Sequence, residues 1–271
     1  MMTSQQLEAY LQLIGLPGLE GATPENLTLL QRGQLEHIPY ATLSLRTEKE
    51  FPSLETEALF ERIVERRRGG YCFELNGLFA EVLRTLGYQV TEYFGRWHFG
   101  ETDPVPMRRH RVLRVDCGGR AFIADAGIGG QGPVVPLELV CGQEQKRGER
   151  AYLLVRDPQL GIVVKTQTPE GFVPFYSFTE DPHFPQDFLY SHYYYSTVPE
   201  SRFLQRFYMH RQTEFVQYFI RHPEAPETLR AFCIRENGVE THCERILCRE
   251  QLHKILTCHF GVHCSPEELP D

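Results

Sequence analysis

The sequence predicts an α+β fold, because the pattern of apolar residues changes partway along its 271 residues. Residues 5–87 carry apolar side chains at helical spacing. From about Tyr88 onward, the chain breaks into short β-branched and aromatic segments separated by Gly, Pro and Asp. We therefore expect a helical domain over residues 1–87, a β-domain over residues 88–199, and a mixed region over residues 200–271.

Two adjacent helices are predicted at the end of the helical domain. The first covers residues 55–67 and is followed by Gly69-Gly70, which supplies a stop. The second begins near Tyr71 and ends near Gly87. It places a row of apolar side chains on one face: Leu75, Leu78, Phe79, Val82, Leu83 and Leu86.

The predicted strands follow in order along the second domain. They are the segments YQVTEYF, HRVLRV, RAFIAD, RAYLLVRD and GIVVKTQ, and they indicate an antiparallel sheet or barrel that runs to about residue 199. In the C-terminal region, Asn237-Gly238 predicts a hairpin and residues 249–258 predict a final helix.

Composition argues against several classes of protein. The formal net charge of −8 does not suit nucleic acid or an anionic membrane as the main partner. The first residues, MMTSQQLEAYLQLIGLPG, lack the basic and apolar parts of a signal peptide, and no window approaches the roughly 18 apolar residues of a membrane span. We therefore expect a cytoplasmic protein whose eight cysteines are thiols rather than a disulfide framework.

Cys72 lies in the segment RRRGGYCFELNGLF, residues 66–79, where a helix is predicted to begin. The first turn of a helix has free backbone N–H groups and a positive dipole end, which favour a thiolate. A free thiol with a pKa of about 8.5 is only a few per cent ionised at neutral pH, so a reactive cysteine normally needs a histidine held by an acid. Without such partners, a cysteine at this position is interpreted as a small buried apolar residue.

His110 and Asp125 supply those partners if one predicted hairpin has the right turn. With Gly118-Gly119 as a two-residue turn, Cys117 pairs with Arg120. His110 and Asp125 then become diagonal neighbours on one face of the sheet. A loop with an odd number of residues would put them on opposite faces, so the inference depends on this turn.

Other motifs do not lead to a site. Residues 127–132 fit the pattern GxGxxG, but the following Pro133 and Pro136 cannot open the helix that a dinucleotide site needs. Cysteines and histidines are frequent over residues 243–264, yet they contain no CxxC pair, so we expect no metal. The basic clusters are expected to be solvated faces, although one of them could meet an anionic cofactor: Arg66-Arg67-Arg68, Arg108-Arg109-Arg111 and Lys146-Arg147.

The segment RGGYCFELN, residues 68–76, resembles the RGGxCxELN segment around the acylated cysteine of the arylamine N-acetyltransferases. His110 at the start of a strand and the DxGxG turn at residues 125–129 are also similar to that family. Further counterparts are YLQLIGL, HIPYATLSL, DFLYSHYYYSTVPESRF and FGV, so the resemblance covers nearly the whole chain in order.

The resemblance implies a helical domain, an antiparallel β-barrel and a C-terminal α/β lid, with a Cys-His-Asp triad like that of cysteine proteases. Members of the family accept an acetyl group from acetyl-CoA on the cysteine and pass it, by ping-pong kinetics, to an arylamine, arylhydrazine or N-hydroxyarylamine. Carried over, Cys72 is the nucleophile, His110 is the general base and then acid, and Asp125 orients the histidine. Acetyl-CoA would be the donor, with no metal, in a role such as xenobiotic metabolism.

Several positions depart from the family pattern where substrates are expected. The family usually has Phe-Glu-Asn-Leu where this chain has YATL at residues 40–43, an aromatic residue in place of Ile128, and a histidine in place of Val198. The residues expected to contact the substrates are Tyr40, Tyr71, Phe73, Ile128, Gly129, Gly130 and Phe203.

Four activities remain open from the sequence. The main hypothesis is an acetyl-CoA-dependent arylamine N-acetyltransferase. Alternatives are a transferase that uses another acyl-CoA, an amide synthase that closes a macrolactam from a carrier-bound chain, and a hydrolase of the cysteine protease or transglutaminase type. A catalytically silent binding module fits poorly with an intact triad. The acceptor, the preferred acyl chain, the biological role and the oligomeric state are left undetermined.

Overall fold

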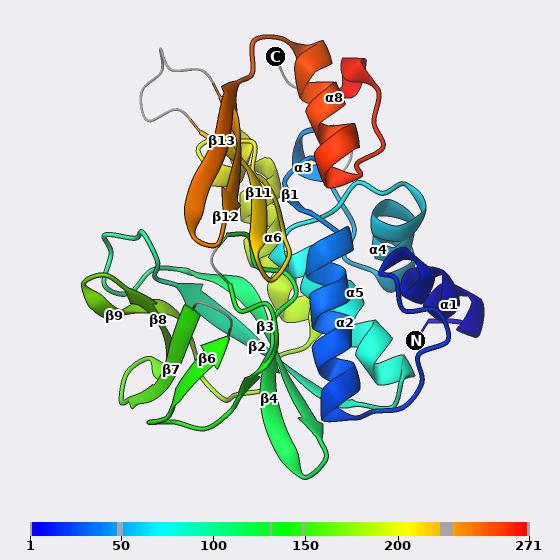
Figure 1. Cartoon of the computed structure of the whole chain (residues 1–271). Coiled ribbons are helices and arrows are strands. Elements are labelled where there is room, and N and C mark those ends of the chain that lie inside the picture. The colour runs from blue at the N-terminus through cyan, green and yellow to red at the C-terminus, as the bar shows by residue number, and fades with distance from the viewer. Residues whose placement is uncertain (1, 48–50, 131, 148–149, 223–229, 270–271) are drawn as a thin grey trace.

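A computed structural model describes residues 2–47, 51–130, 132–147, 150–222 and 230–269. As Figure 1 shows, helices from the first part of the chain lie beside a large curved sheet, and a smaller sheet with the last helix lies above both. The expected α+β fold is confirmed. No described helix is long and apolar enough to cross a membrane.

The N-terminal helices form one core around α5 (Cys72–Thr85), whose apolar face is buried as predicted. Gly87 ends this helix with a φ of +93°. The predicted helix at residues 55–67 is observed as α4 (Thr56–Phe60) continued by the π-helix η1 (Glu61–Glu65). The remaining helices of this part are α1 (Ser4–Leu13), α2 (Pro24–His37) and the short α3 (Ser44–Thr47).

The sequence pattern missed a strand in this helical part. Tyr40–Ala41 forms β1, which pairs antiparallel with β10 (Met209–Gln212) and is also bridged to Gly70. Pairing between segments so far apart in the chain produces no periodic pattern of apolar residues in the local sequence. The contact joins the beginning of the chain to its C-terminal sheet, beside the start of α5.

The large sheet is antiparallel throughout, with the order β5-β4-β3-β2-β9-β8-β7-β6, and curls into a nearly closed barrel. Its strands are β2 (Gln89–Trp97), β3 (Arg108–Cys117), β4 (Arg120–Ala124), β5 (Leu137–Glu138), β6 (Glu144–Arg147), β7 (Arg150–Asp157), β8 (Gly161–Thr168) and β9 (Gly171–Phe178). All five strand segments named from the sequence fall within these strands or end next to them.

The β-rich region ends earlier than predicted. After Phe178 the chain forms the 3₁₀ turn η2 (Pro185–Phe188) and the helix α6 (Leu189–Thr197), so the expected sheet to residue 199 is wrong over this stretch. Its many tyrosines favour strands. A helix forms because Phe188, His192 and Tyr195, at helical spacing, are buried together.

The hairpin that carries the candidate triad has the predicted register. Cys117 pairs with Arg120, and Gly118 and Gly119 have φ values of +58° and +71°. Positive φ at both central residues gives the two-residue turn whose twist matches that of the strands. Asp125 follows β4 directly, so the hairpin puts it on the same face as His110 in β3.

The C-terminal sheet has the order β1-β10-β11-β12-β13 and packs on the last helix, α8 (Arg249–Phe260). Its other strands are β11 (Val216–Arg221), β12 (Ala231–Glu236) and β13 (Val239–Arg245), and the predicted turn at Asn237-Gly238 joins the last two. The short α7 (Arg202–Gln205) precedes this sheet, and the 3₁₀ turn η3 (Pro266–Glu268) follows α8.

One pair of cysteines corrects the expectation of eight thiols. Cys233 and Cys243 form a disulfide. They lie directly opposite each other on β12 and β13, where antiparallel pairing brings side chains close. The other six, Cys72 among them, are free thiols.

Candidate active site

Cys72 is the first residue of α5, where backbone N–H groups have no partner within the helix. The residue is buried, and its Sγ lies 3.4 Å from the carbonyl oxygen of Arg109 on β3. The sulfur therefore sits where the positive end of a helix meets the barrel.

Gly69 brings the segment before Cys72 close to β1. It has a φ of +66°, and a Cβ atom there would lie only 2.5 Å from the carbonyl oxygen of Pro39. Side-chain-bearing residues rarely adopt this backbone conformation, and the space is closed as well. The close approach allows the amide of Ala41 to donate to the carbonyl of Gly70 at 2.7 Å, which fixes Tyr40 beside the cysteine.

The buried carboxylate of Glu74 fixes the start of α5 from within the helical core. Glu74 accepts a hydrogen bond from the backbone N–H of Tyr71 at 3.0 Å. It also forms an ion pair with Arg62, whose Nη1 lies 3.0 Å from its Oε1. Ser44 donates a further hydrogen bond to it at 3.2 Å. A buried carboxylate with this many donors is stable only in one arrangement, so the network holds the helix terminus in place.

His110 is held from the barrel side. Its Nε2 lies 2.6 Å from Oδ2 of Asp125, and both side chains are buried. Trp97 and Tyr176 contact the imidazole ring edge-on. With Nε2 committed to Asp125, Nδ1 is the ring nitrogen left to face Cys72, whose side chain lies near enough to raise the pKa of the imidazole.

The same contacts decide the charge of His110. Burial lowers its pKa, but the Asp125 carboxylate, helped by Cys72, outweighs burial and raises the pKa to about 10. His110 is therefore protonated at neutral pH in the free protein. An imidazolium beside a thiol favours the thiolate–imidazolium pair that cysteine nucleophiles use.

Asn76, one turn along α5 from Cys72, ties the helix to the barrel. Its Nδ2 donates to Oδ1 of Asp125 at 2.8 Å and to the carbonyl of Arg111 at 2.6 Å, while its Oδ1 accepts from the backbone N–H of Ala126 at 3.1 Å. Gly127 is needed next to it, because a Cβ atom there would lie 2.9 Å from the Asn76 amide carbon.

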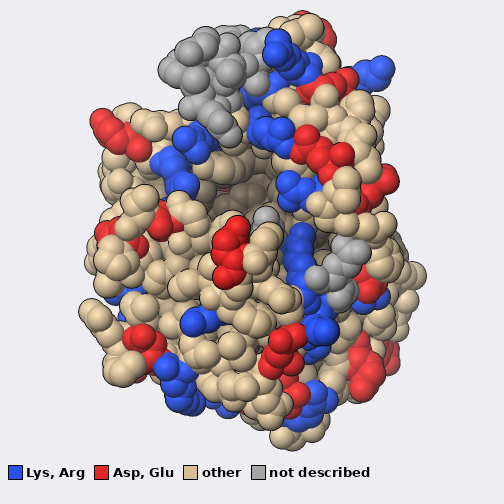
Figure 2. Space-filling model, turned by 60° about the vertical axis from the view of Figure 1, so that its left-hand side comes forward, with Lys and Arg blue, Asp and Glu red and all other residues tan. Residues whose placement is uncertain are grey.

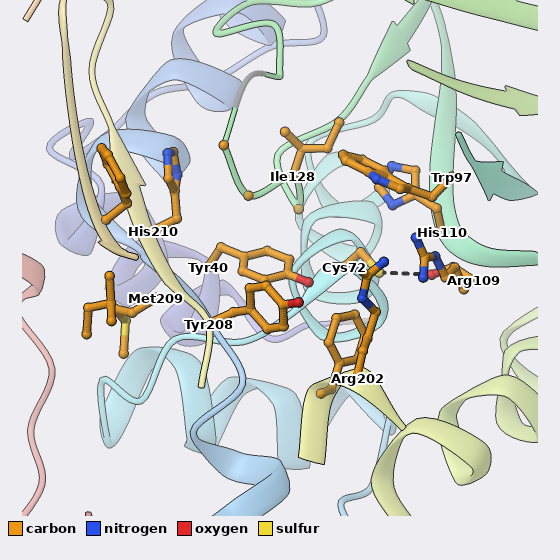
Figure 3. A pocket seen from close by; sticks show the side chains of 16 residues that line it. Tyr40, Cys72, Trp97, Arg109, His110, Ile128, Arg202, Tyr208, Met209 and His210 are labelled. Carbon is orange, nitrogen blue, oxygen red and sulfur yellow. Dashed lines mark hydrogen bonds between the residues drawn. The ribbon is translucent and has the colours of Figure 1, made fainter. Parts of the chain in front are cut away.

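A cavity of about 240 Å³ opens over Cys72 between the barrel, β1 and the C-terminal sheet. Figure 3 shows the ring of Tyr40 and the side chains of Ile128 and Trp97 around it. The remaining lining residues are Cys72, Arg109, His110, Gly127, Gly129, Gly130, Arg202, Phe203, Tyr208, Met209, His210, Phe219 and Ile220. The wall is mainly apolar, with its charged groups gathered near the sulfur.

Five of the seven residues expected to contact substrates line this cavity: Tyr40, Ile128, Gly129, Gly130 and Phe203. The structure places the other two side chains in the helical core instead. The hydroxyl of Tyr71 hydrogen-bonds with His192, and the ring of Phe73 packs against Phe94 and Phe188. Because their neighbour Cys72 opens a helix, their side chains point to other faces of it.

Sequence reasoning missed several lining residues. Trp97 ends the observed strand β2, three residues beyond the predicted segment, and Tyr208, Met209 and His210 lie at the start of the C-terminal sheet, so only the fold brings them here. Arg109 belongs to the basic cluster Arg108-Arg109-Arg111, one of the clusters for which the sequence left contact with an anionic cofactor open. Arg202, in contrast, carried no local signal.

The described residues contain one group of side chains compact enough to hold a metal ion: Cys233, Glu240 and Cys243. Two of its three ligands form the disulfide. The group lies in the β12–β13 hairpin, away from the residues that line the cavity.

Comparisons with known proteins agree with one another. A family model described as N-acetyltransferase matches residues 23–269. The arylamine N-acetyltransferase of Mycolicibacterium smegmatis is 32% identical over 266 residues, covering 96% of this chain and 92% of that protein. A Salmonella typhimurium relative named arylamine N-acetyltransferase / N-hydroxyarylamine O-acetyltransferase is 32% identical over 205 residues, covering 76% of this chain and 72% of its own length.

Solved structures of this family share the fold. That of the Salmonella typhimurium arylamine N-acetyltransferase superposes with a TM-score of 0.89 at 27% identity, covering 99% of this chain and 97% of its own. The Mycobacterium marinum enzyme in complex with CoA superposes with a TM-score of 0.85 at 26% identity, covering 97% of this chain and 96% of its own.

Proposed function

Because the chain belongs to the arylamine N-acetyltransferase family, a family of acyltransferases, we propose that it transfers an acetyl group from acetyl-CoA to an arylamine, arylhydrazine or N-hydroxyarylamine through an acetyl-cysteine. The observation that carries this proposal is the meeting of Cys72, at the positive end of a helix, with His110 held by Asp125, beneath one apolar cavity. These are the parts that acyl transfer through a cysteine requires.

In the first half-reaction, the Cys72 thiolate attacks the thioester carbonyl carbon of acetyl-CoA. A C–Sγ bond forms, the carbon–sulfur bond to CoA breaks, and the departing CoA thiolate takes the proton of the His110 imidazolium. One thioester replaces another, so the step is nearly thermoneutral. The free backbone N–H groups in the first turn of α5 are suited to stabilise the oxyanion that forms in between.

In the second half-reaction, the amine nitrogen attacks the acetyl carbonyl carbon. The new C–N bond forms as the C–Sγ bond breaks, and His110 accepts the proton that the nitrogen loses, which restores the thiolate–imidazolium pair. Aromatic amines are neutral at physiological pH and attack without a strong base. Proton transfer by a positioned histidine contributes roughly 10²–10⁴-fold to such a step.

Asp125 orients the imidazole and does not need to change its own protonation state. Its two oxygens are divided between the partners, Oδ2 with His110 and Oδ1 with Asn76. This division fixes the plane of the carboxylate and, through it, the direction of Nδ1.

Acetyl-CoA as donor is supported by the Mycobacterium marinum relative, whose structure contains CoA. The apolar wall of the cavity, with Trp97, Phe203 and Phe219, suits an aromatic acceptor. Neither argument requires a metal ion or another cofactor for the transfer.

Steady-state kinetics with acetyl-CoA and an arylamine such as 4-methoxyaniline test the proposal. Parallel lines in double-reciprocal plots at several fixed acceptor concentrations are expected, because CoA leaves before the acceptor reacts. Intersecting lines would mean direct transfer without an acyl-enzyme. No transfer to any arylamine or arylhydrazine would favour a carrier-dependent amide synthase or a hydrolase.

A further inference from the structure

Two arginines stand at the cysteine end of the cavity. Arg109 precedes His110 in β3, and Arg202 is the first residue of α7; both line the cavity with Cys72. Figure 3 shows their side chains at the same end of the cavity as the sulfur. Neither is required by the transfer steps described above.

The arginines share one carboxylate. Oε1 of Glu101 lies 2.5 Å from Nη2 of Arg109 and 2.5 Å from Nη1 of Arg202. Tyr195 lies near Arg109 and Tyr208 near Arg202, but neither of these tyrosines supplies a carboxylate. Two guanidinium groups against one carboxylate leave an excess of one positive charge beside the reacting sulfur.

The other titratable groups on the cavity wall do not cancel this charge with a second carboxylate. Burial raises the pKa of Tyr40 well above its usual value, so its phenol stays neutral. Burial, with Arg150 and Arg235 nearby, lowers the pKa of His210 to about 3, so its imidazole is neutral too.

Acylation does not remove this excess of positive charge. In the proposed first half-reaction, the thiolate of Cys72 becomes a neutral thioester while the imidazolium of His110 gives its proton to CoA, so these two opposite charges disappear together. The two guanidinium groups keep their charges and still share the single carboxylate of Glu101, so one positive charge remains without an anionic partner of its own. A planar guanidinium fork matches the geometry of a carboxylate.

We propose that Arg109 and Arg202 bind a carboxylate of the substrate, so that the preferred substrates of this site carry one close to the reacting atoms. This inference rests on the proposed acyl transfer and deepens it. Either of two kinds of substrate would supply this carboxylate: a CoA donor that carries a short dicarboxylic acyl group, or an arylamine that bears a carboxylate. The rest of the cavity, formed by side chains such as Ile128 and Phe203, receives the apolar part of either.

Lys and Arg side chains also gather on one part of the surface, although the chain as a whole has a net charge of −8. Figure 2 shows a hollow in one face of the molecule, with Lys and Arg side chains on both sides of it and Asp and Glu side chains below it. Lys and Arg side chains beside a hollow raise the local concentration of anions there.

Substrate pairs matched in shape but not in charge test the proposal. In the donor arm, kcat/KM is measured for succinyl-CoA against the neutral butyryl-CoA, with one neutral arylamine as acceptor. In the acceptor arm, 4-aminobenzoate is compared with 4-aminobenzamide, with acetyl-CoA as donor. We expect the carboxylate member to be preferred about tenfold or more in one arm, and the arm in which this occurs identifies the source of the carboxylate.

Three variants of the protein complete the experiment. Arg202→Met keeps the length of the side chain and removes its charge, and it is expected to reduce the carboxylate preference about tenfold. Arg202→Lys keeps the charge but loses the guanidinium fork, and it is expected to retain only part of the preference. Arg156→Met, which removes an exposed arginine that pairs with Glu180, is the control and is expected to leave the preference unchanged.

Equal rates for both members of each pair would overturn the inference. So would an Arg202→Met variant that slows the charged and neutral substrates by the same factor, because the arginines would then serve the thiolate or the fold alone. In either case acetyl transfer to the neutral arylamine continues, which separates this failure from failure of the proposed function. Loss of transfer with every pair would overturn both.

Discussion

Asn76 Nδ2 lies 2.8 Å from Oδ1 of Asp125, and this hydrogen bond joins the helix that carries the candidate nucleophile to the barrel that carries its histidine. The nucleophile and its base come from different parts of the fold, so something must fix their separation. Asn76 does this from inside the protein, where its side chain is fully buried.

Replacing Asn76 with alanine is therefore expected to reduce kcat/KM for acetyl transfer by about 10- to 100-fold, because small displacements of reacting groups are costly. It also leaves polar partners of Asn76 unsatisfied, with an expected loss of about 1–3 kcal/mol in the free energy of unfolding. The activity is compared at a temperature where urea titration shows that the variant is folded. Unchanged activity in a folded variant would show that Asp125 does not need this support.

The pKa of His110 predicts how stability depends on pH. In the unfolded chain the pKa of histidine is about 6.5, whereas in the folded protein that of His110 is raised to about 10. The stabilisation is thus complete below about pH 6.5 and is lost as the pH rises toward 10. We expect the free energy of unfolding to fall between pH 7 and 10 in the wild type by more than in Asp125→Asn.

Urea denaturation of both proteins at pH 7, 8 and 9 measures this difference. Asp125→Asn removes the anion that raises the pKa of His110, so its pH dependence should be flatter in this window. If the two curves ran parallel, His110 would not be held as an imidazolium by Asp125.

Gly69→Ala is expected to destabilise the protein and to impair activity together. The new Cβ atom would combine unfavourable backbone strain, at a φ of +66°, with a contact of 2.5 Å to the carbonyl oxygen of Pro39. Gly18→Ala is the matched control, because Gly18 has a φ of +71° with nothing within 4 Å of an added Cβ atom. Strain of this kind costs on the order of 1–3 kcal/mol, so only the excess over the control belongs to the contact.

Thermal or urea unfolding of both glycine variants, with kcat/KM for acetyl transfer, separates strain from contact. A larger loss of stability and activity in Gly69→Ala is the expected result, because the contact displaces Tyr40 beside Cys72. Equal losses in the two variants would mean that the approach of Gly69 to β1 is not needed.

Ile128 is expected to limit the size of the acceptor. Its side chain is buried in the cavity wall and fills the space next to Gly132, where an added Cβ atom would lie 1.8 Å from its Cγ2. Ile128→Ala should raise kcat/KM for a two-ring arylamine relative to a one-ring arylamine, at a cost of about 2–5 kcal/mol in stability. The rate of acylation by acetyl-CoA without acceptor serves as the internal control. A ratio that does not change would place the acceptor elsewhere in the cavity.

The sequence predicted the parts of the site that depend on short-range geometry. Cys72 at a helix start follows from the glycines before it, and the shared face of His110 and Asp125 follows from one two-glycine turn. Tyr40, in contrast, reaches the site through a strand that pairs with His210. No local pattern marks such a pairing.

Long-range packing also explains what the sequence pattern missed. Helix α6 forms from residues that favour strands because its buried face meets the helical core. Arg202 approaches the cysteine through an ion pair with Glu101, 101 residues earlier in the chain. The wall of the cavity was therefore less predictable than the candidate triad.

The most direct test of the central claim is the mass of the intact protein after incubation with acetyl-CoA in the absence of any acceptor. The account predicts that the wild type gains the mass of one acetyl group, that Cys72→Ser gains none, and that an added arylamine removes the group from the wild type. An unmodified wild-type protein, or an equal gain in Cys72→Ser, would contradict transfer of acetyl through Cys72.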